Sequence, residues 1–119
     1  MAEALARKYG SDVLIASSAG LSPAMMTIDL TRRALEEKNC DLGDHLPRKL
    51  SDVKLSEIDL IINMSGYQLP VKSAPGGPRV ENWNVADPYG SAYGEYQKAC
   101  NDIEMRVMQL ILRMRTGKL

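Results

Sequence analysis

The fold is decided by Ile58-Asp59-Leu60-Ile61-Ile62-Asn63-Met64, residues 58–64, which is the strongest strand signal in the sequence. A nearly continuous run of branched apolar residues is typical of a strand buried on both faces of a parallel sheet. A second run of this kind, Val13-Leu14-Ile15-Ala16, lies within residues 12–18. Residues 79–85 are expected to form a third, shorter strand that carries Trp83.

Helical patterns alternate with these strands. Residues 1–9 are rich in strong helix formers, and Gly10 follows as a stop. A second helix is expected from residue 25 or 27 to residue 39, and a short helix or turn over residues 51–56. The last thirty residues form one long helix with apolar residues at spacings of three and four: Tyr96, Cys100, Ile103, Val107, Leu110, Ile111 and Met114. The alternation predicts a single α/β domain over residues 1–119 with a mainly parallel sheet.

Composition narrows the function classes. The 119 residues contain fifteen acidic and fifteen basic side chains, so no net charge attracts nucleic acid or an anionic membrane. No apolar run reaches the roughly 20 residues of a membrane span, and the first residues lack the apolar core of a signal peptide. The two cysteines, Cys40 and Cys100, have no zinc-site spacing. We therefore expect a cytoplasmic protein without a metal or cofactor.

Five stretches, in order, resemble one family. They are MAEALAR (1–7), SSAG (17–20), DLGDHLPRKL (41–50), IDLIINM (58–64) and ADPYG (86–90). Together they are similar to segments of the low-molecular-weight protein tyrosine phosphatases and of the related thioredoxin-coupled arsenate reductases. The resemblance covers essentially the whole chain. It implies a three-layer α/β/α fold of the phosphotyrosine phosphatase I type, and a phosphotyrosine protein or a phosphate ligand as partner.

In that family a central first strand and a C-x5-R-[ST] loop precede the helix that residues 1–7 resemble. We therefore expect a truncated domain that lacks this strand and loop. Phosphoryl transfer of this kind needs a thiolate of lowered pKa within a nest of backbone amides, and an arginine that clamps the phosphoryl oxygens. Residues 1–119 alone are accordingly predicted to be catalytically inactive.

One segment matches C-x5-R by spacing alone. Cys100 and Arg106 are six positions apart, but the segment has no glycine and carries two acidic residues, Asp102 and Glu104. It also lies within the predicted C-terminal helix, where backbone amides are already bonded within the helix. We interpret Cys100 as a core residue. Cys40, which has no arginine six residues later, is interpreted in the same way.

The resemblance also assigns roles to residues of this sequence. Asp87, in Asp-Pro-Tyr, matches the family's general acid, although Asp-Pro is also a common turn initiator. Tyr89 and Tyr93 resemble the aromatic wall around a phosphotyrosine ring, with ordinary packing as the alternative. Ser18 and His45 resemble positions that support the phosphate-binding loop.

Three functions remain open at this stage. The first is an inactive family member that serves as a binding or scaffold module. The second is an active phosphatase whose catalytic N-terminal segment is missing from this sequence. An arsenate reductase is disfavoured because Met64–Leu69 lacks the additional redox cysteines that a thiol relay needs. The third is an unrelated nucleotide-binding module, which the lack of GxxxxGK[ST] and GxGxxG motifs argues against.

Loss of a central strand would remove much of the stability of such a sheet and expose two strand edges. A folded chain must compensate for this loss. We therefore expect the strands around residues 13–17 and 58–63 to pair directly, or a second copy to cover the gap in a homodimer.

Overall fold

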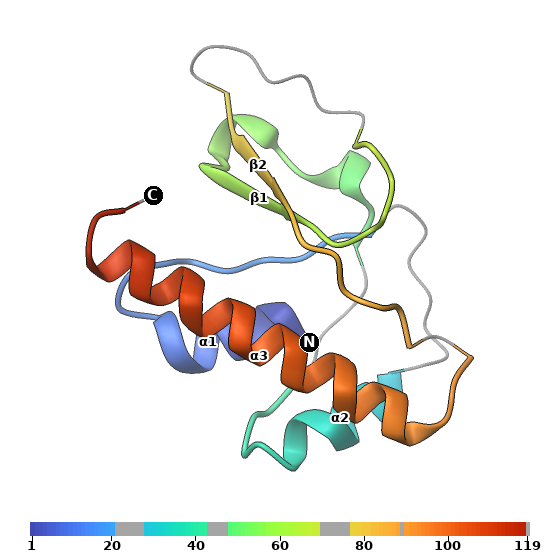
Figure 1. The fold of residues 1–119 in the computed structure, drawn as a ribbon. Coiled ribbons are helices and arrows are strands. Elements are labelled where there is room, and N and C mark those ends of the chain that lie inside the picture. The colour runs from blue at the N-terminus through green and yellow to red at the C-terminus, as the bar shows by residue number, and fades with distance from the viewer. Residues whose placement is uncertain (21–27, 43–47, 70–76, 89, 119) are drawn as a thin grey trace.

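The computed structural model describes residues 1–20, 28–42, 48–69, 77–88 and 90–118. Its elements are, in chain order, α1 (Ala2–Gly10), α2 (Ile28–Glu36), the 3-10 turns η1 (Leu50–Asp52) and η2 (Leu55–Glu57), β1 (Leu60–Asn63), β2 (Arg79–Asn82) and α3 (Tyr93–Arg115). Figure 1 shows the three α-helices grouped on one side of the two strands.

The two strands run in parallel. Leu60 lies opposite Arg79 and Asn63 opposite Asn82, so the carboxyl ends of both strands meet at one edge of the sheet. The predicted α/β fold with parallel pairing is confirmed. Both strands are shorter than expected, because β1 covers four residues and β2 ends before Trp83.

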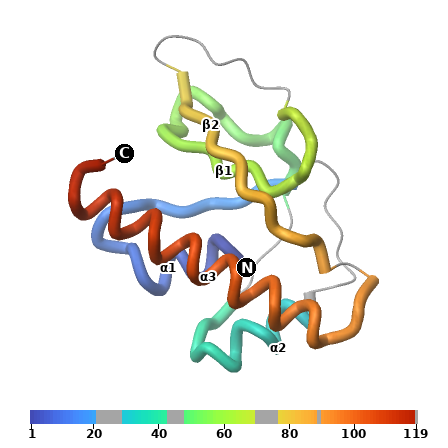
Figure 2. Tube along the Cα trace, viewed as in Figure 1, coloured from blue at the N-terminus to red at the C-terminus, as the bar shows by residue number. Residues whose placement is uncertain are grey.

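The core lies mainly between the helices. The apolar stripe of α3 packs against α1 and α2, as the spacing of apolar residues predicts. Figure 2 shows these two helices beside α3. The buried side chains of α3 are Tyr96, Ala99, Cys100, Ile103, Val107, Leu110 and Ile111. Apart from Ala99, they share one core cluster with Ala4 and Leu5 of α1 and Ala34 and Leu35 of α2. Each large apolar side chain buried in this way contributes roughly 1.5–3 kcal/mol.

The strand expected over residues 12–18 does not form, so this prediction is wrong. Asp12 lies in the turn after α1, where Val13 and Leu14 both donate backbone hydrogen bonds to the Gly10 carbonyl. Residues 14–19 form no strand, and Ile15 is 102% exposed. Strand structure requires a partner ladder, and the only pairing near this segment is a single parallel bridge between Gly20 and Lys49 within the described residues.

The direct pairing expected between this segment and β1 is therefore wrong. β1 pairs only with β2 within the part of the chain that the structure describes. Three of the four β1 residues are consequently only half-buried. Association of two copies through strand edges stays a prediction.

The second helix ends earlier than its pattern predicts. α2 stops at Glu36, and a turn over residues 37–39 brings Asn39 to a φ of 54°. The Cys40 amide then donates to the Leu35 carbonyl at 3.0 Å. Lys8 of α1 donates to the Lys38 and Asn39 carbonyls, which are otherwise left without helical partners. A residue from another helix thus completes this helix end.

One ion pair connects the sheet to α3. Arg113 donates to Glu81 of β2 at 2.6 Å, and the Trp83 indole also donates to Glu81 at 3.1 Å. These two hydrogen bonds hold the pKa of Glu81 below its usual value.

Among the described residues, no helix is both long and apolar enough to cross a membrane.

Two glycines offer a matched test of helix packing. A Cβ at Gly10 would lie 2.8 Å from side-chain carbons of the buried Ile111, whereas a Cβ at Gly94 would meet nothing within 4 Å. We expect Gly10→Ala to destabilise the chain by about 1–2 kcal/mol, since overpacking outweighs the gain in helix propensity. Gly94→Ala should leave stability unchanged or raise it by up to about 1 kcal/mol. Urea unfolding measures both, and equal effects at the two positions would contradict this packing.

Candidate functional site

The carboxyl edge of the sheet is the natural place for a site, because ligands of parallel α/β sheets bind outside this edge. The chain leaves β1 through residues 64–69 and leaves β2 through residues 83–88. Figure 1 shows that the start of α1 and the far end of the segment that follows α1 lie toward the same side of the molecule as this edge. The fold thus brings four regions toward this edge: the two segments that follow the strands, the start of α1 and the end of the segment after α1.

Asn63, the last residue of β1, organises this edge. Its side-chain amide donates to the Tyr67 carbonyl at 2.7 Å and to the Asn82 side chain at 2.8 Å. Its side-chain oxygen accepts from the Ser65 amide at 3.0 Å and from the Ser65 hydroxyl at 2.7 Å. Gly66, with a φ of 78°, completes the turn. Asn63 therefore fixes both the loop after β1 and the end of β2.

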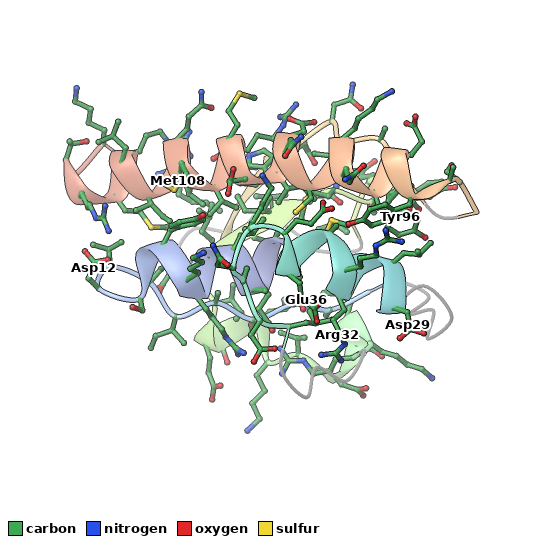
Figure 3. The ribbon with its side chains drawn as sticks, turned by 90° about the horizontal axis from the view of Figure 1, so that it is seen from below. Asp12, Asp29, Arg32, Glu36, Tyr96 and Met108 are labelled. Carbon is green, nitrogen blue, oxygen red and sulfur yellow. The ribbon has the colours of Figure 1, made fainter. Side chains whose placement is uncertain are left out.

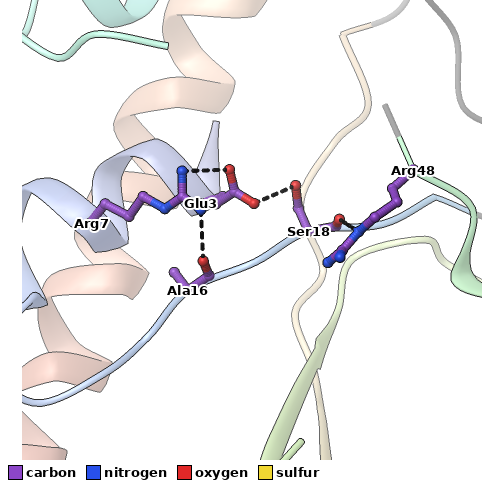
Figure 4. A network of polar contacts seen from close by, with 5 residues as sticks. All are labelled: Glu3, Arg7, Ala16, Ser18 and Arg48. Carbon is purple, nitrogen blue, oxygen red and sulfur yellow. Dashed lines mark hydrogen bonds and ion pairs between the residues drawn. The ribbon is translucent and has the colours of Figure 1, made fainter. Parts of the chain in front are cut away.

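A second polar network joins the start of α1 to residues 16–18 (Figure 4). The Ser18 hydroxyl donates to Glu3 at 3.1 Å, and Arg7 pairs with Glu3 at 3.4 Å. Arg7 also donates to the Ala16 carbonyl at 3.2 Å, and Arg48 donates to the Ser18 carbonyl at 3.3 Å. Side chains thus bond the carbonyls of Ala16 and Ser18. In a β-sheet, backbone amides of a neighbouring strand would bond such alternate carbonyls.

The structure describes three of the five residues that the resemblance selected. Ser18 supports the start of α1, as described above. Asp87 lies exposed in the segment between β2 and α3. Tyr93 is the first residue of α3. Tyr89 and His45 lie outside the described residues.

Tyr93 takes part in helix packing. The Arg33 guanidinium of α2 lies 4.1 Å from the centre of its ring. Burial and the nearby Glu37 raise the pKa of Tyr93, although its buried hydroxyl has no hydrogen bond of good geometry among the described residues. Its role in an aromatic wall stays a prediction.

Both cysteines of the sequence are core residues, as predicted. Cys40 is 4% and Cys100 0% exposed, and both are free thiols. Burial raises the pKa of each thiol. A nucleophilic cysteine requires the opposite, because only the thiolate attacks and because its surroundings must lower the pKa.

The C-x5-R spacing at Cys100 is indeed accidental. Cys100 lies within α3, facing the core. Arg106 donates to Asp102 at 2.9 Å and to the Asn84 carbonyl at 3.1 Å, so its guanidinium already has protein partners.

No group of three or more metal-ligating side chains occurs among the described residues.

The sequence profile described as "Low molecular weight phosphotyrosine protein phosphatase" matches residues 1–118. The chain therefore belongs to this family. The fold is similar to that of an arsenate reductase from Archaeoglobus fulgidus DSM 4304, with 27% identity, a TM-score of 0.77, and coverage of 92% of this chain and 86% of the reductase.

Two further solved structures are similar. One is described as an arsenate reductase in the reduced state, with 22% identity and a TM-score of 0.76. The other is described as an arsenate reductase in the phosphate binding state, with 22% identity and a TM-score of 0.78. Both matches cover 95% of this chain and 86% of the other chain. They support the fold alone.

The role of Asn63 was not predicted from the sequence. A polar residue at the end of an apolar strand was the available signal, because Asn is depleted in strands and favours turns. Its partner Asn82 is nineteen positions away, and only the parallel register brings the two together.

Replacement of Asn63 should be costly. Asn63→Ala removes four hydrogen bonds at a buried position, and we expect a loss of about 1–3 kcal/mol in the free energy of unfolding. Ser65→Ala, at an exposed residue whose backbone amide still bonds Asn63, should lose less than about 1 kcal/mol. Urea unfolding of the two variants tests this assignment. A smaller effect for Asn63→Ala than for Ser65→Ala would refute it.

Proposed function

We propose that residues 1–119 form the scaffold and general-acid part of a phosphotyrosine phosphatase-family domain, and that these residues alone do not hydrolyse phosphate esters. The burial and raised thiol pKa of both cysteines carry this proposal. A phosphocysteine intermediate cannot form at a thiol that neither solvent nor substrate reaches. The chain would then act as a binding module for a phosphorylated partner.

Asp87 supports the assignment to phosphatase chemistry. It lies in the exposed segment that follows β2, and the Ser91 amide bonds the Pro88 carbonyl at 2.9 Å to form a turn directly after it. A carboxyl group in such a position can protonate the leaving tyrosyl oxygen and later activate water. Asp87 can play this role only if a nucleophile attacks the same phosphoryl group.

Arsenate reduction is the less favoured chemistry, despite the similar reductase structures. Reduction by a thiol relay needs several cysteines that can reach one another and solvent. Cys40 and Cys100 are both buried, and residues 64–69 contain no cysteine. The chain therefore fits phosphotyrosine chemistry better than redox chemistry.

The second candidate function is an active tyrosine phosphatase in which a segment outside residues 1–119 contributes the nucleophile. The polar network at the start of α1 favours it, because Ser18 and Glu3 lie where such a segment would join the helix. In that enzyme Asp87 would be the general acid.

Assay of residues 1–119 with p-nitrophenyl phosphate and a phosphotyrosine peptide tests the first proposal. We expect no turnover above background, and the same result for Cys40→Ser and Cys100→Ser. Turnover that either substitution abolishes would overturn it.

The second candidate is tested on a longer chain. If the genomic sequence encodes an in-frame strand and C-x5-R-[ST] before Met1, the extended protein should hydrolyse both substrates. Asp87→Asn should then lower kcat by roughly 10²–10⁴-fold, the usual contribution of a general acid. Asp52→Asn, at an exposed residue of η1, is the matched control and should leave kcat unchanged. An unchanged kcat in Asp87→Asn would contradict the assigned role.

A further inference from the structure

Residues 37–42, which we call the strap, follow the end of α2 and contribute little to the core. Cys40 is the only fully buried side chain within these described residues, and Leu42 is half-buried against the same core cluster. The exposed side chains of the strap are Glu37, Asn39 and Asp41. Apolar packing alone therefore holds the strap weakly.

One carboxylate on α3 fastens the strap to two helices. Glu104 accepts a hydrogen bond from Lys38 of the strap at 3.1 Å and another from Tyr9 of α1 at 3.0 Å. Lys38 and Glu104 are both half-buried, and hydrogen bonds between charged groups are stronger than neutral ones. Burial would raise the pKa of Glu104, but the hydrogen bonds from Lys38 and Tyr9 outweigh it and lower this pKa. We call these three residues the latch.

A second contact comes from α1. Lys8 donates to the carbonyls of Lys38 and Asn39, and both contacts are exposed to solvent. The strap is thus closed mainly by polar contacts with side chains of other elements. Segments with few buried apolar contacts and exposed hydrogen bonds open at a lower free energy than a packed core.

The two thiols reach solvent by different routes. Cys40 lies in the strap, so release of the strap exposes it while the three helices stay packed. Cys100 lies in the buried stripe of α3. Figure 3 shows α1 and α2 along one side of α3, and the stripe faces these two helices. Solvent therefore reaches Cys100 only when α3 separates from them.

We propose that the strap opens and closes as a unit on a packed helical core, and that the latch sets how often Cys40 becomes reactive. Opening breaks the contact between Lys38 and Glu104. It also removes burial, which is the largest cause of the raised pKa of Cys40, so the thiolate fraction rises. A group added to the sulfur would overpack the core, so the modified strap stays open. The device works whether or not the domain acts on phosphotyrosine.

Alkylation of the unmodified chain by iodoacetamide at pH 8, with peptide mapping, tests the proposal. The thiolate sulfur displaces iodide and forms a bond to carbon. Cys40 should react at least about tenfold faster than Cys100, because its opening is local. Urea below the unfolding transition should leave the rate at Cys40 nearly constant, since strap opening exposes little surface, and should raise the rate at Cys100 steeply. Equal rates with the same urea dependence would overturn the proposal.

A latch variant tests the role of the ion pair. Lys38→Met removes the cation and keeps the apolar stem, so it should raise the rate at Cys40 by roughly fivefold or more and leave the rate at Cys100 unchanged. Lys98→Met is the matched control, because it breaks an exposed pair with Glu95 on α3, and it should change neither rate. An unchanged rate at Cys40 in Lys38→Met, or an equal rise at both cysteines, would refute the latch.

Discussion

The packing of α3 on α1 and α2 is the constraint on which the rest of the structure depends. It buries the largest set of apolar side chains among the described residues and leaves the small sheet as an attached layer. The same packing decides the chemistry of the sulfur atoms. Cys100 faces this core from α3, and Cys40 enters it directly after α2, so the interactions that stabilise the fold also keep both thiols protonated. Stability and the proposed lack of a nucleophile thus share one cause.

The sheet mainly positions the segments that follow its strands, and it contributes less than the helices to the buried core. Its parallel register aligns Asn63 with Asn82 and directs the following segments toward one edge, including the segment that carries Asp87. Polar side chains also hold the neighbouring segments: Asn63 holds the loop after β1, and Arg7 and Arg48 bond the carbonyls of residues 16 and 18.

Local patterns predicted the helices better than the strands. The apolar spacing of residues 96–111 fixed the buried face of α3, because helix periodicity depends on neighbours within the same segment. The strand expected over residues 12–18 failed because a strand exists only with a partner, which no local pattern supplies. The end of α2 depends on Lys8 from another helix, and the role of Asn63 depends on a residue across the sheet. The resemblance selected Ser18 and Asp87, but their contacts and exposure required the three-dimensional arrangement.

The central claim concerns the accessibility of the two thiols, and their rate of alkylation measures it directly. Iodoacetamide should modify Cys40 and Cys100 of the folded chain at pH 8 at least about tenfold more slowly than in urea, because only exposed thiolates react. Peptide mapping by mass spectrometry reports each site separately. Rapid modification of either cysteine in the folded chain would contradict this account. So would a pH dependence of the alkylation rate whose midpoint lies below about 8.5, the usual pKa of a free thiol.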